Sequence, residues 1–218
     1  MPNAIPDVVV QRLPRYLRAL RALQDEGVEV VSSQELGWRL QVTPAQIRKD
    51  LSYFGRFGKQ GRGYNVTFLL EDLTQILGLN HKWSAVVVGV GRLGRAVLGY
   101  PGFIPEGFEL VAAFDADPKM VGTEISGVRV RLSSDMRECI KENNVQIAIV
   151  TVPATAAQSV VDELVSYGIR AILSYAPVAL RVPPSVRVRI LDPVLALETL
   201  TFYLHSAERE HTGAQWVV

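Results

Sequence analysis

A glycine-rich turn between an apolar strand and a helix constrains the fold of this chain more than any other feature. Residues 85–88 are a continuous apolar run rich in β-branched residues, which is typical of a parallel strand buried on both faces. The run leads into a G-x-G-x-x-G sequence at residues 89–94, and residues 92–100 are predicted to form a helix. This order of strand, turn and helix predicts a Rossmann domain that binds a dinucleotide.

Each glycine has a physical role in such a site. Gly89 allows the tight turn, Gly91 lets the backbone approach the pyrophosphate, and Gly94 lets the helix pack closely on the strand. The helix N-terminus offers unpaired N–H groups and the positive end of its dipole to the phosphates. A second strand at residues 110–114 leads into Asp115, whose carboxylate can accept hydrogen bonds from ribose hydroxyls and repels a 2′-phosphate. The pattern therefore predicts NAD(H) rather than NADP(H), the alternative being a structural loop without a nucleotide.

Two further apolar strands, at residues 145–151 and 171–173, are predicted to end at the same edge of the sheet. Ligands of open parallel sheets bind beyond the carboxyl ends of the strands, so the segments that follow these strands are candidates for the nicotinamide end. The residues expected to bind the cofactor, NADH or NAD⁺, are Gly89, Val90, Gly91, Arg92, Leu93, Gly94, Tyr100, Asp115, Lys119, Thr151, Val152, Pro153, Ser174, Tyr175, Ala176 and Pro177.

The N-terminal part of the chain has the pattern of a winged helix-turn-helix. Residues 7–25 are predicted to form an amphipathic helix, and capping boxes at Ser32 and Thr43 each open a short helix. In residues 55–64, glycines are interspersed with cationic residues. This pattern predicts the β-hairpin wing of a winged helix. An extended segment at residues 64–68 and a helix at about residues 68–77 are expected to follow.

Positive charge is concentrated in the same region. Residues 1–82 carry 11 Lys and Arg against 8 Asp and Glu, a net charge of +3, whereas residues 83–218 carry 12 against 14, a net charge of −2. This asymmetry indicates an anionic partner for the first part, and the basic helix and wing favour DNA over a merely solvated surface. The residues expected to contact DNA are Gln46, Arg48, Lys49, Ser52, Tyr53, Lys59, Gln60, Arg62 and Tyr64.

The last predicted helix begins after Asp192, a favourable N-cap, with Pro193 as its first residue. Eight of the eleven residues 194–204 are apolar, which is too many for a helix that covers a single surface. A second subunit is the simplest cover, so the sequence predicts a homodimer. The expected domains are a winged-helix DNA-binding domain at residues 1–80, a Rossmann domain at 81–191, a dimerisation helix at 192–210 and a tail at 211–218.

The composition excludes several other classes of protein. A single cysteine, Cys139, excludes an internal disulfide, and no apolar run approaches the ~20 residues of a membrane span. The N-terminus lacks the charged-then-apolar pattern of a signal peptide. We therefore expect a cytoplasmic protein with no membrane association, and we expect no metal site.

Taken together, these segments resemble the Rex family of redox-sensing transcriptional repressors. The match covers nearly the whole chain, and the run QIRKDLSYFG at residues 46–55 is its most specific part. The resemblance implies a homodimer whose winged helices bind a palindromic operator when NADH is scarce. It implies that NADH, favoured over NAD⁺, closes the dimer and releases the DNA. It also implies that the C-terminal helix is domain-swapped and is wedged between the two domains of the partner.

Two segments depart from the family pattern. The sequence Ser-Tyr-Ala-Pro at residues 174–177 stands where the family usually has Asn-Phe-Ala-Pro, which indicates altered contacts to the nicotinamide. Gln60 stands in the wing where a Lys or Arg is usual. Minor-groove contact is then expected to fall to Arg62.

An enzyme is the main alternative, namely a small NAD-dependent dehydrogenase or reductase. Hydride transfer needs a general acid or base near the nicotinamide, yet His81, His205 and His211 all lie outside the predicted Rossmann core. No residues remain for a substrate domain, so we do not expect an enzyme. A DNA-binding sensor of another nucleotide or of an acyl-CoA is the third possibility.

Three polar residues are candidates for a switch between the two functional states. We expect Arg18 to pair with Asp192 across the dimer in the DNA-binding state, and Tyr100 to compete for Asp192 when NADH is bound. The alternative is a surface arginine, an ordinary N-cap and a half-buried tyrosine. A coupling free energy of about 1–3 kcal/mol between NADH binding and DNA binding requires contacts that differ between the two states.

Overall fold

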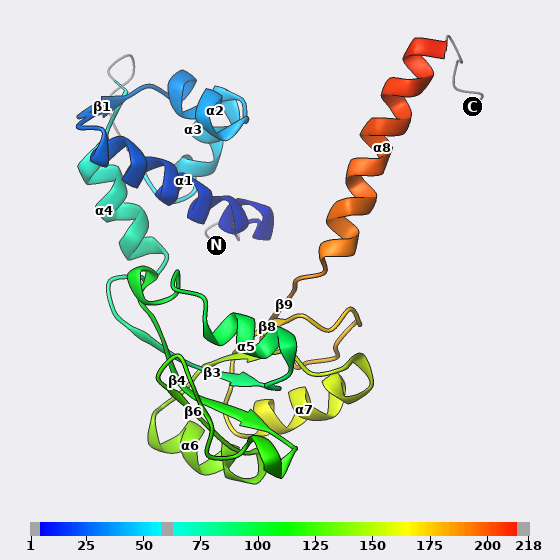
Figure 1. The fold of residues 1–218 in the computed structure, drawn as a ribbon. Helices are drawn as coiled ribbons and strands as arrows, with labels where there is room; N and C mark the ends of the chain where they lie inside the picture. Colours follow the sequence, from blue (N-terminus) through cyan, green and yellow to red (C-terminus); the bar gives the residue numbers. More distant parts are fainter. Residues whose placement is uncertain (1–4, 58–62, 213–218) are drawn as a thin grey trace. The chain divides into compact units, whose positions relative to one another are not determined.

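The computed structural model describes residues 5–57 and 63–212, with side chains up to Ser206 (Figure 1). It consists of two compact units, Met1–His81 and Lys82–Val218, which are described separately. Within the described residues, none of the helices is long and apolar enough to cross a membrane.

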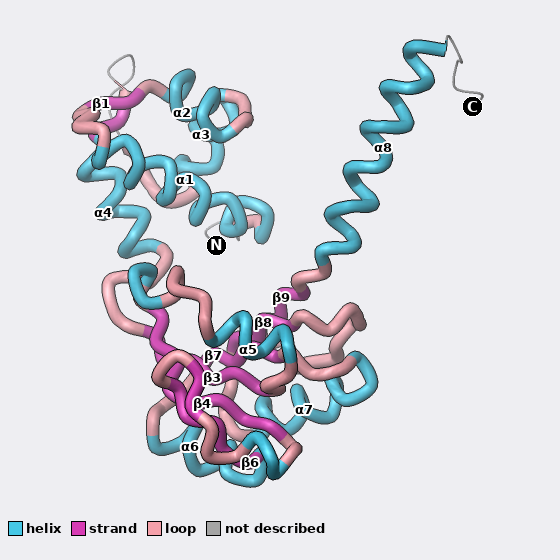
Figure 2. The backbone as a smooth tube through the Cα atoms, in the orientation of Figure 1, coloured by secondary structure: helices cyan, strands magenta, loops and turns pink. Residues whose placement is uncertain are grey.

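The second unit is built on a seven-stranded sheet with the order β5-β6-β4-β3-β7-β8-β9 (Figure 2). All neighbouring strands are parallel except β5, which pairs antiparallel with β6. The six parallel strands have the order of a Rossmann sheet, with the first strand, β3, at the centre. The strands are β3 (Trp83–Val88), β4 (Phe108–Asp115), β5 (Glu124–Ile125), β6 (Val128–Leu132), β7 (Ile147–Val150), β8 (Ala171–Ser174) and β9 (Arg187–Ile190).

Helices cover both faces of this sheet. Alternate residues of β3 point to opposite faces: Val87 packs in the cluster that includes α5 (Arg92–Leu98), whereas Val86 packs with α6 (Met136–Glu142) and α7 (Ala154–Ser166). Both faces of the central strands are therefore apolar, as the continuous apolar runs predict. Short 3₁₀ helices occupy Ile104–Glu106, Pro118–Met120 and Ser133–Asp135.

The first unit consists of four helices and a two-stranded sheet. Side-chain caps open the two helices of the helix-turn-helix: Ser32 Oγ accepts from Glu35 N at 3.0 Å, and Thr43 Oγ1 accepts from Gln46 N at 3.1 Å. Within the described residues the reciprocal half of each predicted capping box does not form, because the Gln46 side chain bonds to Asp50 and that of Glu35 pairs with Arg39. Strand β1 pairs antiparallel with β2, which joins the residues before the helix-turn-helix to those after the wing. The elements are α1 (Asp7–Asp25), β1 (Val30–Val31), α2 (Ser33–Leu40), α3 (Pro44–Ser52), β2 (Tyr64–Asn65) and α4 (Val66–Ile76).

Several predicted boundaries are wrong, among them the strand at residues 145–151, which is observed as Ile147–Val150. The extended segment at residues 64–68 ends at Asn65, because Asn65 Oδ1 accepts from Phe68 N at 2.9 Å and so caps α4 two residues earlier than expected. Helix α5 ends at Leu98 rather than at residue 100, so Tyr100 lies beyond the helix. The short strand β5 was not predicted. Residues 58–62, which are half of the predicted wing, lie outside the described residues.

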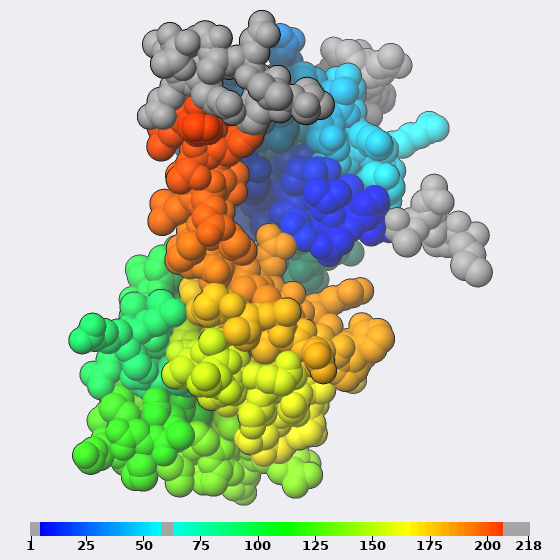
Figure 3. Space-filling view, turned by 90° about the vertical axis from the view of Figure 1, so that its right-hand side faces the viewer, coloured from blue at the N-terminus to red at the C-terminus, as the bar shows by residue number. Residues whose placement is uncertain are grey.

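Helix α8 (Pro193–Thr212) follows β9 and begins at the predicted cap, where Asp192 Oδ1 accepts from Val194 N at 2.9 Å. Its large apolar side chains are exposed, among them Leu197 at 60% and Leu204 at 68%. Figure 3 shows the orange and red turns of α8 on the molecular surface rather than within the core of its own unit. Within the described residues of the single chain, nothing covers these apolar side chains. The helix extends two residues past the predicted end at 210.

Candidate functional site

The glycine-rich turn is held by hydrogen bonds to residues at the ends of the two neighbouring strands. Gly89 N donates to Phe114 O at 2.8 Å, and Thr151 Oγ1 donates to Gly89 O at 2.6 Å. The turn therefore lies where β3, β4 and β7 end. This is the point at which the strand order reverses, and ligands of open α/β sheets bind there.

The three glycines are needed for different reasons. A Cβ on Gly94 would lie 1.9 Å from Gly89 O, so this position permits only glycine at the close contact between helix and turn. Gly89 has a positive φ of +94° and lies against Thr151 and Val152. A Cβ on Gly91 would meet no protein atom within 4 Å. The fold does not require a glycine at Gly91, but a phosphate approaching the backbone there would, so the turn fits a pyrophosphate.

Asp115 joins the end of β4 to the glycine-rich turn. Its Oδ2 accepts from Val90 N at 2.6 Å and its Oδ1 accepts from Asp117 N at 2.9 Å. Asp117 Oδ1 in turn accepts from Lys119 N at 2.9 Å, which orders the segment after the strand. The structure thus holds a carboxylate beside the turn, where it can accept hydrogen bonds from a ribose.

The remaining predicted cofactor residues differ in exposure. Ser174 is fully buried at the end of β8, where its Oγ accepts from Ala176 N at 3.2 Å, and Tyr175 is half-buried. Tyr100 is 58% exposed and packs edge-to-face on Phe103, with 5.3 Å between ring centroids. The other exposed members of the predicted set are Gly91, Arg92, Leu93, Lys119, Pro153 and Pro177.

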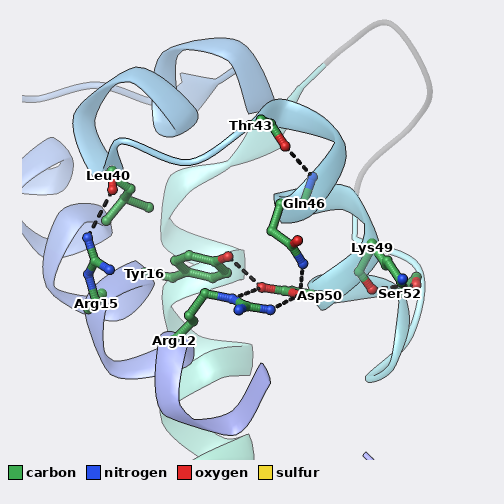
Figure 4. A network of polar contacts seen from close by, with 9 residues as sticks. All are labelled: Arg12, Arg15, Tyr16, Leu40, Thr43, Gln46, Lys49, Asp50 and Ser52. Carbon is green, nitrogen blue, oxygen red and sulfur yellow. Dashed lines mark hydrogen bonds and ion pairs between the residues drawn. The ribbon is translucent and has the colours of Figure 1, made fainter. Parts of the chain in front are cut away.

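The first unit contains a buried polar network that ties α1 to α3 (Figure 4). Asp50 is fully buried and accepts from Arg12 Nε at 2.6 Å and from Arg12 Nη2 at 2.7 Å. Tyr16 Oη donates to Asp50 Oδ2 at 2.6 Å, and Gln46 Nε2 donates to Asp50 Oδ1 at 2.6 Å. No sequence pattern predicted this network, although Asp50 is the sole acidic residue between positions 39 and 64.

The network fixes the protonation state of its members. Burial by itself raises the pKa of the Asp50 carboxyl, but the hydrogen bonds from Arg12, Tyr16 and Gln46 outweigh burial and leave the pKa below its ordinary value. Burial, and then the hydrogen bond to Asp50, raise the pKa of Tyr16. At neutral pH, Asp50 is therefore an ionised acceptor and Tyr16 a protonated donor.

The predicted DNA-contacting residues are distributed unevenly between the surface and the core. Arg48, Lys49 and Ser52 are exposed on α3, with Arg48 Nη1 donating to Ser33 Oγ at 2.9 Å and Ser52 Oγ to Lys49 O at 2.7 Å. Gln46 and Tyr53 are half-buried. Tyr64 is 9% exposed and belongs to the core of the unit, so its ring is not part of the exposed basic surface. The other three predicted residues, Lys59, Gln60 and Arg62, lie outside the described residues.

Family models match both parts of the chain. The model described as "Putative DNA-binding protein N-terminus" matches residues 4–52, and the model described as "CoA binding domain" matches residues 80–178.

Curated relatives match nearly the full length. The redox-sensing transcriptional repressor Rex of Chloroflexus aurantiacus is 54% identical over 206 residues, which are 94% of this chain and 97% of the relative. The repressor of the same name from Streptomyces griseus is 42% identical over 213 residues, 98% of this chain and 84% of the relative.

Solved structures of RSP, a Rex-family repressor, have the same fold. RSP in complex with NAD⁺ and operator DNA superimposes with a TM-score of 0.89 at 36% identity, covering 98% of this chain and 100% of the RSP chain. RSP in complex with NADH gives a TM-score of 0.88 at 35% identity, covering 97% of this chain and 100% of that chain.

Proposed function

This chain belongs to the Rex family of redox-sensing transcriptional repressors, and we propose that it represses transcription according to the ratio of NADH to NAD⁺. As a homodimer it binds a palindromic operator when NADH is scarce, and it leaves the operator when NADH binds. It acts in the cytoplasm, where the DNA and the nicotinamide cofactors are both found. The observation that carries the proposal is the open backbone at Gly91 beside the Asp115 carboxylate, in a chain that also has a helix-turn-helix.

The proposed cofactor is NADH, with NAD⁺ as a weaker ligand of the same site. Gly91 leaves space for the pyrophosphate, and Asp115 accepts from the adenosine ribose. The same carboxylate would lie close to the 2′-phosphate of NADP(H) or to the 3′-phosphate of a CoA ribose, and like charges repel. This argues against the acyl-CoA alternative, and the complexes of RSP with NADH and NAD⁺ support NAD(H).

The proposed DNA interface is the outward surface of α3 together with the wing. The exposed cations Arg48 and Lys49 lie on the second helix of the helix-turn-helix, which enters the major groove in proteins of this kind. Lys59, Gln60 and Arg62 remain proposed wing contacts. The complex of RSP with operator DNA supports a repressor rather than an enzyme. The curated relatives are likewise named as repressors, so we propose no catalytic residue.

The function can be tested by selecting bound sequences from a pool of random duplex DNA and titrating the complex with nucleotides. We expect a palindrome that NADH releases at much lower concentration than NAD⁺, and no release by NADPH because of Asp115. Binding that is indifferent to NADH would mean that the Rossmann unit senses another ligand. Failure to recover any specific sequence would favour the dehydrogenase alternative.

We propose that Arg18, Tyr100 and Asp192 couple the two sites. Asp192 caps α8, Tyr100 lies beyond the end of α5, and Arg18 is exposed on α1. Because the scheme places the pair of Arg18 and Asp192 in the DNA-binding state, the Arg18→Ala variant should bind the operator more weakly and release it at a lower NADH concentration. A shift of tenfold in the releasing concentration corresponds to about 1.4 kcal/mol of coupling, within the usual range. Lys82→Ala, a change at an exposed cation, is the control, and unchanged NADH sensitivity of Arg18→Ala would contradict the scheme.

A further inference from the structure

We propose that Gln46 recognises an adenine in each operator half-site, and that Asp50 is the positioning residue that orients the Gln46 amide for this contact. The inference rests on the proposed function, because it assumes that α3 enters the major groove. It goes beyond that function in naming the base, and in giving the buried network of α1 and α3 a role in sequence specificity.

Gln46 occupies the position from which a recognition helix reaches the bases. It is the third residue of α3, after the Thr43 cap and Pro44, and its side chain is half-buried. The N-terminal residues of a recognition helix contact base edges, whereas later residues tend to lie nearer the phosphates. The first turn of α3 also carries Ala45, whose methyl group offers no hydrogen bond, so Gln46 is the polar group of this turn that can discriminate between bases.

Asp50 restricts the Gln46 amide to one orientation. The carboxylate is fully buried and accepts four hydrogen bonds, two from Arg12, one from Tyr16 and one from Gln46 (Figure 4). An ionised carboxylate has no hydrogen to donate, so only the amide nitrogen of Gln46, and not its oxygen, can face Asp50. The low pKa of Asp50 keeps it ionised throughout the physiological pH range.

The oriented amide keeps one acceptor and one donor for a ligand. Nε2 gives one hydrogen to Asp50 Oδ1 at 2.6 Å and retains a second, and within the described residues Oε1 receives no hydrogen bond. A contact through both groups uses the N–H on the same side of the amide as Oε1, so the proposal assigns the other N–H to Asp50. A rotation of the amide by 180° would place Oε1 against the carboxylate, and the repulsion between the two acceptors excludes it.

An acceptor beside a donor is the complement of adenine in the major groove. Adenine presents the N6 amino donor beside the N7 acceptor, and a Gln or Asn amide binds both. Guanine presents two acceptors, so one of its atoms would face Oε1 unfavourably. Cytosine presents an N4 donor and thymine an O4 acceptor, and each satisfies only one half of the amide. The geometry therefore favours adenine over the other three bases.

The test uses the full-length protein and an operator recovered by selection, in which each base pair of the half-site is replaced in turn by the other three. The wild-type protein should prefer A·T at one position, symmetrically in both half-sites, by roughly tenfold to a hundredfold. Gln46→Ala should abolish the preference at that position and leave the preferences at all other positions unchanged. Gln46→Glu has no hydrogen to donate to Asp50 and would set a second carboxylate against it, so this variant should also lose the preference for adenine.

The positioning role of Asp50 has its own variants. In Asp50→Asn, the new amide can present either its nitrogen or its oxygen to Gln46, so discrimination at the same base pair should weaken while binding to random DNA persists. Tyr16→Phe is the matched control, because it removes a donor from Oδ2 but leaves the bond between Gln46 and Oδ1. It should retain the preference for adenine. If Asp50→Asn proves to be unfolded by circular dichroism, Gln46→Glu serves instead, because it also removes the hydrogen bond to Asp50 and should lose the preference for adenine.

The outcomes separate this inference from the proposed function. Recovery of an operator that NADH releases, with base preferences that do not depend on Gln46, would overturn only the inference. An equal loss of affinity for every sequence in Gln46→Ala would assign the residue to the phosphate backbone and overturn the inference as well. A full adenine preference in a folded Asp50→Asn variant would show that Asp50 does not orient the Gln46 amide. Failure of the wild-type protein to select any sequence would overturn the proposed function itself.

Discussion

Asp50→Ala is expected to lower the free energy of unfolding of the first unit by about 3–5 kcal/mol, the range seen when one partner of a buried ion pair is removed. Asp50 is fully buried and accepts from both Arg12 and Tyr16, and Tyr16 is 1% exposed. Without the carboxylate, the Tyr16 hydroxyl loses its buried acceptor and the Arg12 guanidinium its countercharge. Because a small domain is stable by only about 5–15 kcal/mol, a loss of this size leaves little margin at growth temperature.

Urea unfolding followed by circular dichroism measures this loss, and hydrogen exchange of the amides in α1 and α3 assigns it to the first unit. Asp25→Ala, which removes an exposed carboxylate at the end of the same helix α1, is the matched control and should change stability by less than about 0.5 kcal/mol. NADH binding, which depends on the second unit, should persist in Asp50→Ala. Wild-type stability in this variant would show that the network contributes little to the fold.

Local sequence rules predicted the elements that depend on local chemistry. The caps at Ser32, Thr43 and Asp192 formed as expected, because each needs only an acceptor side chain two or three residues before an unpaired N–H. The strand, glycine-rich turn and helix of the second unit follow equally local rules. The cap at Asn65 obeys the same rule, but the apolar residues around it also fit an extended segment, and the helix boundary was misplaced for that reason.

Contacts between distant residues were not predictable in the same way. Arg12 and Asp50 are separated by 38 positions, and neither periodicity nor charge counting pairs them. The pairing of β1 with β2 likewise depends on how α1 to α3 pack. Tyr64 was assigned to the DNA surface because it adjoins the basic wing, yet that pairing holds it in the core. The apolar α8 was recognised as needing a partner, since that inference requires only the number of apolar residues.

The candidate nucleotide site was predictable in composition but not in its internal contacts. Gly89, Gly91, Gly94 and Asp115 follow from spacing. The structure shows in addition that Asp115 accepts a hydrogen bond from Val90 N in the turn, and that Thr151 Oγ1 donates one to Gly89 O. These contacts cross between β3, β4 and β7, and they explain why the turn has a defined shape. The space around each glycine separates Gly89 and Gly94, which the fold requires, from Gly91, for which we propose a requirement by the ligand.

Gly91→Ala and Gly94→Ala should therefore have opposite consequences. Alanine at position 91 meets no protein atom within 4 Å and has an allowed backbone conformation, with φ −68° and ψ −163°, so the fold should tolerate it. The added methyl group occupies the space proposed for the pyrophosphate, and crowding of this kind costs about 1–3 kcal/mol. Gly91→Ala should bind NADH roughly tenfold to a hundredfold more weakly while keeping its thermal stability and its operator affinity. It should act as a repressor that needs roughly tenfold to a hundredfold more NADH for release.

Gly94→Ala is the matched comparison, because the same methyl group is added three residues further along. Helix propensity alone would make alanine more stable than glycine inside α5 by about 1 kcal/mol. The Cβ would lie 1.9 Å from Gly89 O, however, so helix and turn must separate, and we expect a loss of stability of about 3 kcal/mol. Thermal unfolding and calorimetric titration with NADH distinguish the two variants. Undiminished NADH binding by Gly91→Ala would mean that the phosphates do not approach the turn, since nothing in the fold itself requires a glycine at that position.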